Sequence, residues 1–307
     1  MIGRVLQAAG GTYSVRAGGR EFDCSLRGRI KLDDGGPVAV GDRVEVERFE
    51  DGSCRITAVL PRRSALIRRA VARRRNQVMA ANVDQVAAVV AAGRPDPDLP
   101  MLDRLLAMAE FDELSAFVVV NKLDLADELP AELAAYEALG YDVLPTSVAD
   151  GTGVAALHER LSGRTTVLAG ASGVGKSSLL NALHPGLDLR VGDVGDRSGR
   201  GRHTTTRARL IPLDDDTYIA DTPGIQHFVP AELEAATLGH AFREFRPWLD
   251  TCKFADCRHR EEPGCAVRDA VEAGDIVRRR YESYLAMLEA VEAAELEART
   301  GGSRSRG

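Results

Sequence analysis

Residues 165–183 read TTVLAGASGVGKSSLLNAL, and this stretch decides the fold expected for the chain. An apolar strand leads into a glycine-rich loop, and an amphipathic helix follows from Lys176. The loop fits G-x-x-x-x-G-K-[ST], in which the glycines let successive backbone N–H groups point at phosphate oxygens. The N-terminus of the helix adds its dipole to the same place. The stretch therefore predicts a phosphate-binding loop, in preference to a strand-to-helix turn without a ligand.

Two side chains of this loop are expected to act on a bound nucleotide. Lys176 would reach the β- and γ-phosphates, and it is counted among the catalytic residues for this contact. Ser177 would offer its hydroxyl to Mg²⁺. The residues predicted to bind the nucleotide here are Gly170, Ala171, Ser172, Gly173, Val174, Gly175, Lys176, Ser177 and Ser178.

A second motif, NKLD at 121–124, predicts that the base is guanine. A buried Asp124 carboxylate would accept hydrogen bonds from N1–H and the exocyclic amine of guanine, a donor pair that adenine lacks. Asn121 would bind the base edge and tie this loop to the phosphate loop, and the Lys122 stem would cover the base face. The motif ends a buried strand, where ligands bind in parallel sheets, and LPTSVADGTG at 144–153 ends the next one.

A third motif, DTPG, runs from Asp221 to Gly224 after the short strand TYIA. Asp221 would hold a Mg²⁺-bound water, and the Gly224 N–H would meet the γ-phosphate. GRGRHTTT at 199–206 lies between the phosphate loop and this motif. We expect Thr205 to complete the Mg²⁺ shell and to sense the γ-phosphate, with Thr204 as the alternative.

The residue that orients the attacking water is not evident from the sequence. Many GTPases place Gln directly after D-x-x-G, but Ile225 stands there and Gln226 comes one residue later. We therefore predict slow intrinsic turnover that a partner raises. His203 is a candidate for positioning the water, and an exposed switch residue is an equal alternative. His227 is interpreted as a surface residue of the second switch.

The order of these motifs is base, phosphate, first switch, second switch, whereas the usual GTPase order begins with the phosphate loop. This order results if the usual GTPase chain is cut after the second switch and its original N- and C-termini are joined near 161–165. The strand at 83–92 then becomes the first of the domain. Strands and helices alternate from there, which predicts a parallel sheet covered on both faces. The domain predicted over 76–229 is a circularly permuted α/β P-loop GTPase.

Short apolar segments separated by glycine pairs precede this domain and predict a β-barrel within residues 1–68. An OB-type RNA-binding barrel is favoured, and an SH3-like barrel would give a similar pattern. Residues 61–75 then carry seven positive charges and no negative ones. This run is interpreted as a phosphate-contacting segment, with a solvated linker as the alternative. Its members are Arg62, Arg63, Arg68, Arg69, Arg73, Arg74 and Arg75.

A cysteine cluster with the spacing C-x4-C-x-H-x5-C predicts a zinc site in a helical module over 230–307. Three thiolates and one imidazole fill a tetrahedral Zn²⁺ shell, so one structural ion is expected, stapling a segment too short for its own core. Free buried cysteines are the alternative. The expected ligands are Cys252, Cys257, His259 and Cys265. Cys24 and Cys54 lack such a pattern and are interpreted as strand-core residues.

The module is expected to contain one helix over 230–245 and a long helix over 275–298, followed by a disordered basic tail. The whole chain has 307 residues and a formal net charge of −6, so any contact with nucleic acid must come from a local patch. The apolar run at 86–92 is far shorter than the roughly 20 residues of a membrane helix. A monomeric cytoplasmic protein without membrane contact is expected.

In this combination of motifs the chain resembles the bacterial ribosome small subunit-dependent GTPases, the RsgA or YjeQ family. The resemblance covers nearly the whole chain and rests on NKLD, GASGVGKSS, GRHTTT, DTPG and the cysteine cluster, in that order. It implies a factor that binds the 30S subunit and 16S rRNA late in subunit maturation and hydrolyses GTP to GDP and phosphate under stimulation by the subunit. It also implies zinc on the four cluster residues and a water-positioning role for His203.

Two other functional classes remain as alternatives. A metabolic P-loop ATPase or kinase would share the phosphate loop, but NKLD and DTPG disfavour it. An RNA-binding protein with a vestigial nucleotide site would share the barrel. The presence of every phosphate and Mg²⁺ residue disfavours that reading.

Overall fold

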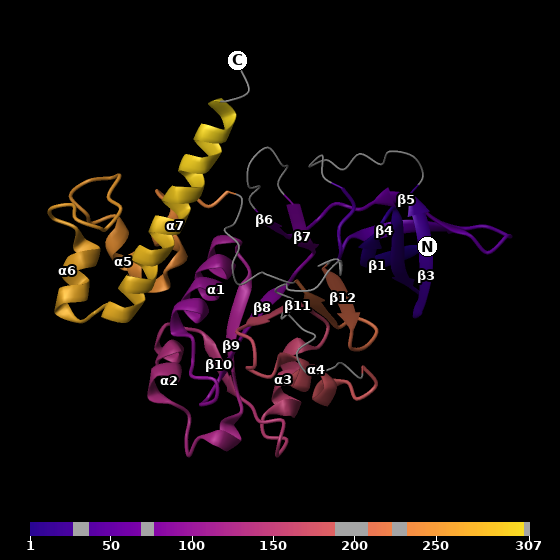
Figure 1. The fold of residues 1–307 in the computed structure, drawn as a ribbon, viewed down its shortest axis with the longest axis horizontal. Helices are drawn as coiled ribbons and strands as arrows, with labels where there is room; N and C mark the ends of the chain where they lie inside the picture. Colours follow the sequence, from indigo (N-terminus) through magenta and orange to yellow (C-terminus); the bar gives the residue numbers. More distant parts are fainter. Residues whose placement is uncertain (27–36, 69–76, 188–207, 223–231, 304–307) are drawn as a thin grey trace.

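The structure is a computed structural model, and it describes residues 1–26, 37–68, 77–187, 208–222 and 232–303. Figure 1 shows an N-terminal barrel and a C-terminal helical module at opposite ends of the long axis, with an α/β domain between them. No helix among the described residues combines the length and apolar character that crossing a membrane requires.

The first five strands form a closed barrel. Their order around the barrel is β1-β2-β3-β5-β4, and pairing of β1 with β4 closes it. β3 and β5 run parallel, while the other neighbours are antiparallel. This five-stranded closure confirms the predicted OB-type barrel. The strands are β1 Ile2–Ala9, β2 Thr12–Ala17, β3 Arg20–Leu26, β4 Arg43–Arg48 and β5 Cys54–Val59.

The interior of the barrel is filled by alternate residues of its strands, among them Val44, Val46 and Ile56. Cys24 and Cys54 face each other in register across β3 and β5, and both are buried in this core. The interpretation of the two cysteines as strand-core residues is therefore confirmed.

The central domain is a sheet in the order β10-β9-β8-β11-β13-β12, parallel except for β12. Successive side chains of a strand point to opposite faces, and each face has its own apolar core. Helices α1 and α2 cover one face, and α3 and α4 cover the other. The strands are β8 Gln85–Ala91, β9 Ser115–Asn121, β10 Asp142–Pro145, β11 Thr165–Gly170, β12 Arg209–Pro212 and β13 Tyr218–Asp221. The helices are α1 Leu99–Phe111, α2 Ala131–Ala138, α3 Val154–Leu161 and α4 Lys176–Leu183.

The predicted strands and helices of this domain are confirmed. In the first helix, α1, the N-cap Asp98 accepts a 3.0 Å hydrogen bond from the Met101 N–H. Strand β9, which carries NKLD, is separated from β11 only by β8. Helix α3 ends at Leu161 and β11 begins at Thr165, at the predicted join of the old chain ends.

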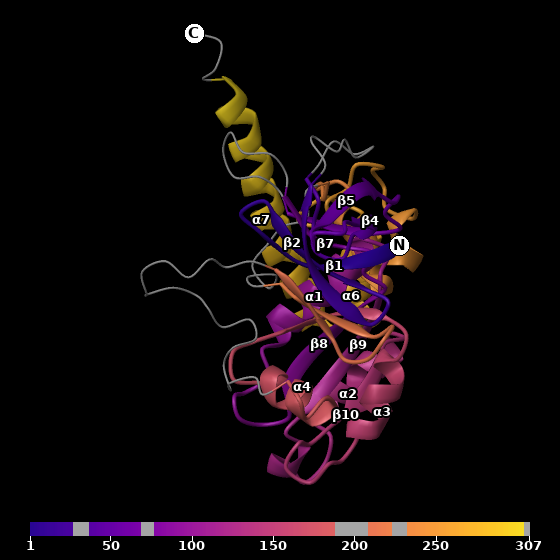
Figure 2. The same cartoon turned by 90° about the vertical axis from the view of Figure 1, so that its right-hand side faces the viewer.

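The barrel and the central sheet are one continuous 11-stranded sheet, because β1 pairs antiparallel with β12. Figure 2 shows the orange strands β12 and β13 lying between the barrel and the other central strands. Arg4 of β1 donates a 2.6 Å hydrogen bond to the Thr165 hydroxyl, which adds a polar contact across the same boundary. The sequence analysis missed β12, because four residues ending in a proline show no period.

The arginine-rich run begins in a hairpin, in which β6 Ala65–Arg68 pairs with β7 Gln77–Ala81. The interpretation as a phosphate-contacting segment is wrong for Arg62. Its guanidinium binds the buried Asp42 carboxylate through two hydrogen bonds of 2.7 and 2.8 Å and is only 9% exposed. Arg63 is 62% exposed and pairs with Asp84 at 3.1 Å. The arginines at 69 and 73–75 lie outside the described residues.

The single helix predicted over 230–245 is wrong. The described part of this stretch forms turns and the short 3₁₀ helices η3 Leu238–Ala241 and η4 Arg243–Phe245, followed by α5 Arg246–Leu249. Phe242 leaves helical geometry at φ −105° and ψ 109°, and its ring is fully buried beside that of Phe245. The bend lets both rings enter the core of the module, which one straight helix would not allow.

The module has its own apolar core, but the segment 252–265 that the predicted zinc site would staple contributes only Cys265 to the buried residues of that core, in agreement with a segment too short for a core of its own. The core joins residues before the cysteine cluster to α6 Ala266–Ala273 and α7 Arg278–Ser303, and it includes Ala107 of α1. α7 is the predicted long helix, and it continues to Ser303, past residue 299 where a disordered tail was expected. Residues 304–307 of that tail lie outside the described residues.

Candidate functional site

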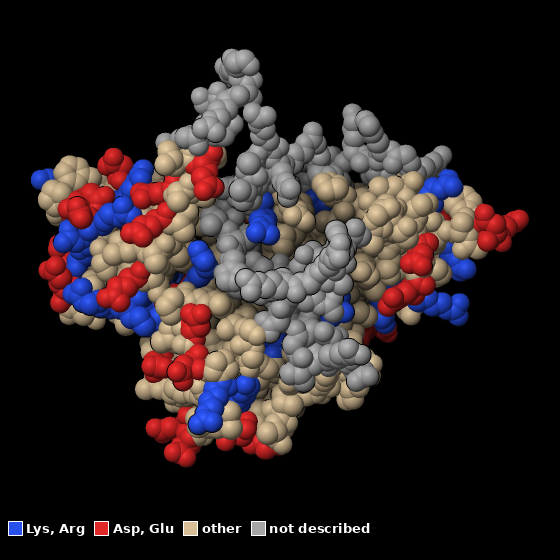
Figure 3. Space-filling view, viewed as in Figure 1, with Lys and Arg blue, Asp and Glu red and all other residues tan. Residues whose placement is uncertain are grey.

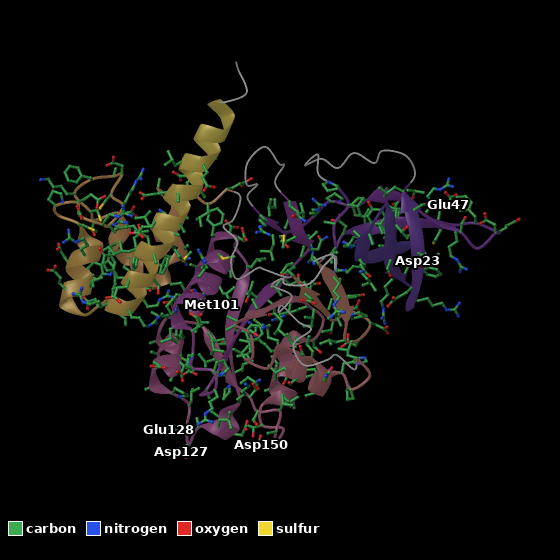
Figure 4. All side chains as sticks on the ribbon, in the orientation of Figure 1. Asp23, Glu47, Met101, Asp127, Glu128 and Asp150 are labelled. Atoms are coloured by element: carbon green, nitrogen blue, oxygen red, sulfur yellow. The ribbon has the colours of Figure 1, made fainter. Side chains whose placement is uncertain are left out.

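The predicted nucleotide loops meet at one edge of the central sheet. NKLD follows β9, LPTSVADGTG follows β10, GASGVGKSS follows β11 and Asp221 ends β13. These are the carboxyl ends of neighbouring parallel strands, where ligands bind in α/β sheets. Figure 4 shows Asp127 and Glu128, which follow NKLD closely in the chain, and Asp150, which lies within LPTSVADGTG, at the same end of the domain.

The phosphate loop has the predicted strand-loop-helix form. Gly175 is the N-cap of α4 with φ 96°, and a Cβ there would collide with the Asn121 side chain. A Cβ on Gly170 would collide with the Val89 carbonyl of β8. The Lys176 ammonium is buried and donates to the carbonyls of Gly170 and Ala171 at 3.0 and 2.7 Å. The loop therefore holds this cation where a phosphate would meet it.

Asn121 and Lys122 tie the NKLD loop to the phosphate loop. The Asn121 amide is buried and donates a 2.8 Å hydrogen bond to the Val174 carbonyl. The Lys122 ammonium donates to the carbonyls of Gly173 at 2.6 Å and of Arg94 at 2.7 Å. The link expected of Asn121 is thus present, and the Lys122 ammonium adds a second one.

Asp124 lies in the 3₁₀ turn Leu123–Leu125 and accepts a 2.7 Å hydrogen bond from the Ser147 hydroxyl. The sequence argument assumed a buried carboxylate, but the Asp124 side chain is exposed. Ser147 is fully buried and belongs to the loop after β10. The loop after β10 therefore orients Asp124 through a side chain.

Two oxygen ligands suited to Mg²⁺ lie in the same region. Ser177 and Asp221 are both buried, the first at the start of α4 and the second at the end of β13. A hydroxyl and a carboxylate are the hard donors that Mg²⁺ takes beside substrate phosphates, so this donor set fits the ion. Arg209 of β12 donates a 3.1 Å hydrogen bond to Asp221 Oδ2.

The remaining residues predicted for hydrolysis lie outside the described part of the chain. These are His203, Thr204, Thr205, Gly224, Ile225, Gln226 and His227.

The four predicted zinc ligands come together in the C-terminal module. The ligand atoms of Cys252, Cys257, His259 and Cys265 all lie within 4.8 Å of one another. His259 Nδ1 is 3.6 Å from Cys252 Sγ and 3.4 Å from Cys265 Sγ. Three sulfurs and one imidazole nitrogen at this spacing fit a closed tetrahedral Zn²⁺ site.

Groups around this cluster prepare it for a metal ion. The hydroxyls of Tyr281 and Tyr284 on α7 donate 2.7 Å hydrogen bonds to the carbonyls of His259 and Arg258. Burial lowers the pKa of His259, which favours the neutral imidazole that a metal needs. Burial also raises the pKa of Cys257 to about 12, so a metal must displace the thiol proton.

Sequence reasoning missed three contacts of the nucleotide site. The role of Ser147 could have been predicted, because it lies in LPTSVADGTG, the stretch after a strand that was already expected to lie near the base. The Arg94 carbonyl follows β8 and carries no side-chain pattern at all. Arg209 is one arginine among many, and only strand pairing brings it to Asp221.

Comparison with known proteins agrees with this architecture. The family described as "RsgA GTPase" matches residues 59–230, and the one described as "RsgA N-terminal domain" matches residues 2–56. A relative from Gemmatimonas aurantiaca, "Small ribosomal subunit biogenesis GTPase RsgA", is 48% identical over 291 residues, 92% of this chain and 95% of the relative. A relative of the same name from Thermotoga maritima is 42% identical over 274 residues, 88% of this chain and 89% of the relative.

Two solved structures share the fold. YjeQ from Thermotoga maritima superposes with a TM-score of 0.73 at 37% identity, covering 94% of this chain and 98% of its own. YloQ, described as a circularly permuted GTPase, gives a TM-score of 0.72 at 29% identity and covers 95% of each chain. With the permuted sheet, the barrel and the cysteine cluster in place, the chain belongs to the RsgA family of GTPases and is a circularly permuted P-loop enzyme that hydrolyses GTP.

Proposed function

We propose that this GTPase binds the small ribosomal subunit late in its maturation and that the subunit stimulates conversion of GTP to GDP and phosphate. The relatives named above carry small-subunit biogenesis in their names, and they align with nearly the whole chain. The observation that supports a working enzyme best is the 2.8 Å bond from Asn121 to Val174, which joins base loop and phosphate loop. A partner of this kind implies work in the cytoplasm.

In the proposed site, the Asp124 carboxylate accepts hydrogen bonds from the guanine edge. The hydrogen bond that the Ser147 hydroxyl donates to this carboxylate fixes its orientation. Lys176 exchanges its loop carbonyls for the β- and γ-phosphate oxygens, because a phosphate is the stronger acceptor for an ammonium. Gly224 adds a backbone N–H to the γ-phosphate. The residues of the nucleotide site thus bind and orient the phosphates before hydrolysis.

Mg²⁺ bound with GTP would neutralise the charge that develops on the phosphates during hydrolysis. Ser177 would offer it a hydroxyl, Asp221 would hold a Mg²⁺-bound water, and Thr205 would complete its ligands. His203 positions the attacking water, since Ile225 has no polar atom to do so. Intrinsic turnover is slow in this proposal, and the subunit raises it.

The proposed contact with 16S rRNA belongs to the barrel and the exposed arginines beside it. Arg63 and Arg68 remain exposed, whereas Arg62 is used inside the fold. Figure 3 shows basic and acidic side chains interspersed over the C-terminal module, which is not a uniformly basic face. Part of that mixture is paired, because Arg258 and Arg260 both bind Glu292. These features favour the barrel side for sequence-independent phosphate contacts.

The test is GTP turnover with and without purified small subunits, across a range of salt concentrations. We expect stimulation by mature or nearly mature subunits that weakens as salt rises, because phosphate contacts release counterions. Equal turnover with and without subunits would overturn the proposal. A parallel competition with ATP addresses the kinase alternative, since ATP that displaces GTP at similar concentration would exclude guanine selection by Asp124.

A further inference from the structure

Arg209 occupies the point where the barrel meets the nucleotide site. It lies on β12, where its backbone register partner on one side is Gln7 of barrel strand β1 and on the other is Asp221 of β13. Cross-strand partners of this kind have neighbouring side chains on one face of a sheet. The Arg209 Nε–H indeed donates to Asp221 Oδ2 at 3.1 Å.

The two partners differ in their access to solvent. The Asp221 side chain is 7% exposed, and that of Arg209 is 39% exposed. A buried carboxylate depends strongly on its hydrogen-bond partners for orientation. The half-exposed guanidinium therefore restricts the rotation of Asp221 from the solvent side, without being part of the phosphate or base loops.

The positive charge of Arg209 also acts on any cation that Asp221 serves. A guanidinium hydrogen-bonded to this carboxylate repels a divalent ion that the carboxylate serves, and the repulsion is stronger where solvent is excluded. Arg209 also withdraws one carboxylate oxygen from other partners. Both effects make Mg²⁺ binding weaker than it would be with an unpaired Asp221.

We propose that Arg209 is a positioning residue that holds Asp221 from strand β12 and sets the Mg²⁺ concentration at which nucleotide is retained. Because β12 also pairs with β1 at Gln7, the barrel helps to hold Arg209 in place beside Asp221. The inference rests on the proposed role of Asp221 in Mg²⁺ binding. Arg209 lies outside the sequence motifs, and its strand connects the barrel, which is proposed to contact RNA, to the proposed Mg²⁺ site.

The experiment measures release of a fluorescent GDP analogue from the full chain as Mg²⁺ is titrated, with EDTA as the zero point. Arg209→Gln removes the charge but keeps a hydrogen-bond donor, and Arg209→Lys keeps the charge. We expect Arg209→Gln to lower the half-maximal Mg²⁺ concentration roughly 3- to 10-fold, because it removes one positive charge from the neighbourhood of the ion. Arg209→Lys should stay within about twofold of the wild type, because it retains that charge.

Arg16→Gln is the matched control. Arg16 of β2 forms another ion pair between barrel and central domain, with Asp215 at 3.3 Å, and it does not contact Asp221. It should leave the Mg²⁺ titration unchanged. Release in EDTA should be equal in all variants, because the nucleotide then has no Mg²⁺ for Arg209 to influence.

The outcomes separate this inference from the function on which it rests. If the rate of nucleotide release from the wild-type protein does not depend on Mg²⁺ concentration, the proposed metal role of Asp221 is contradicted. A Mg²⁺-dependent wild type with an unchanged or right-shifted Arg209→Gln titration would overturn the role of Arg209 alone. Equal shifts in Arg209→Gln and Arg209→Lys would also overturn it, since only the strand packing would then matter.

Discussion

Arg280 of α7 donates a 2.8 Å hydrogen bond to Asp103 of α1, and both side chains are buried. Ser283 donates to the same carboxylate at 2.6 Å, and Glu244 accepts from Arg280 at 2.6 Å. The exposed side of the same boundary adds the pairs of Glu110 with two arginines, Arg243 and Arg246. The C-terminal module is thus attached to α1 of the GTPase domain by a charged network.

Asp103→Ala should lower the free energy of unfolding by about 3–5 kcal/mol, because it removes one of the two carboxylates that bind the buried Arg280 guanidinium and leaves the buried Ser283 hydroxyl without its acceptor. Urea unfolding followed by circular dichroism measures this. The control is Glu292→Ala, which removes the partner of the exposed Arg258, and it should cost less than about 1 kcal/mol. Similar losses for both variants would mean that the buried network contributes no more than a surface pair.

Affinity for the small subunit should depend on the bound nucleotide. The second switch leads along the chain into the zinc module, so we expect the GTP state to set the angle between module and GTPase domain. The network at Asp103 implies that α1 moves together with the module. Binding of purified subunits should be tighter with a non-hydrolysable GTP analogue than with GDP. Equal affinities would rule out this coupling.

Removal of zinc should destabilise the C-terminal module selectively. Cys265→Ser replaces a buried ligand, so the variant should lose about one equivalent of bound zinc and unfold at a lower temperature. Atomic emission gives the metal content, and calorimetry gives the unfolding temperature. Cys54→Ser is the matched control, because Cys54 is buried in the barrel outside the cluster. Full zinc content in the Cys265→Ser protein would contradict the proposed ligand set.

Asp112→Asn should stabilise the protein more at pH 8 than at pH 5. Burial raises the pKa of the Asp112 carboxyl to about 7, with the charge of Glu232 adding to the effect. Asp112 Oδ2 has no hydrogen-bond partner among the described residues. A folded-state pKa above the unfolded value means that wild-type stability falls as pH rises from about 4 to about 7.

Asparagine removes this titration, so the gain in unfolding free energy should be about 2–3 kcal/mol larger at pH 8 than at pH 5. Urea midpoints at the two pH values measure it. Glu113→Gln removes a charge from the exposed neighbouring residue and should show no such difference. A gain independent of pH would show that Asp112 does not titrate in this range.

His203→Ala should reduce subunit-stimulated GTP turnover by roughly 10²–10⁴-fold while leaving nucleotide binding intact, as expected for loss of a water-positioning group. Single-turnover hydrolysis and nucleotide titration separate the two effects. Thr204→Ala alters the adjacent residue and should cost less, since Thr205 is the proposed Mg²⁺ ligand. Normal turnover of His203→Ala with subunits present would remove His203 from the mechanism.

Much of the central domain was predictable because its features are local. The helix α1 carries its own N-cap, and the buried strands carry continuous apolar runs. The helix expected over 230–245 failed because apolar spacing alone cannot show that the Phe242 and Phe245 rings must both turn into one core. Arg62 was misread for a related reason, since its partner Asp42 lies in a different part of the chain.

Short sequence motifs were enough to predict the main functional groups of this protein: a phosphate loop, a guanine motif placed before it, and a zinc-ligand spacing. Each depends on a short run of backbone or on ligand types within one segment, so it can be recognised without the fold. The contacts of Ser147 with Asp124, of Arg209 with Asp221 and of Asp103 with Arg280 could be found only in the folded chain. Those contacts join distant segments, and their geometry exists only once the strands and helices have packed.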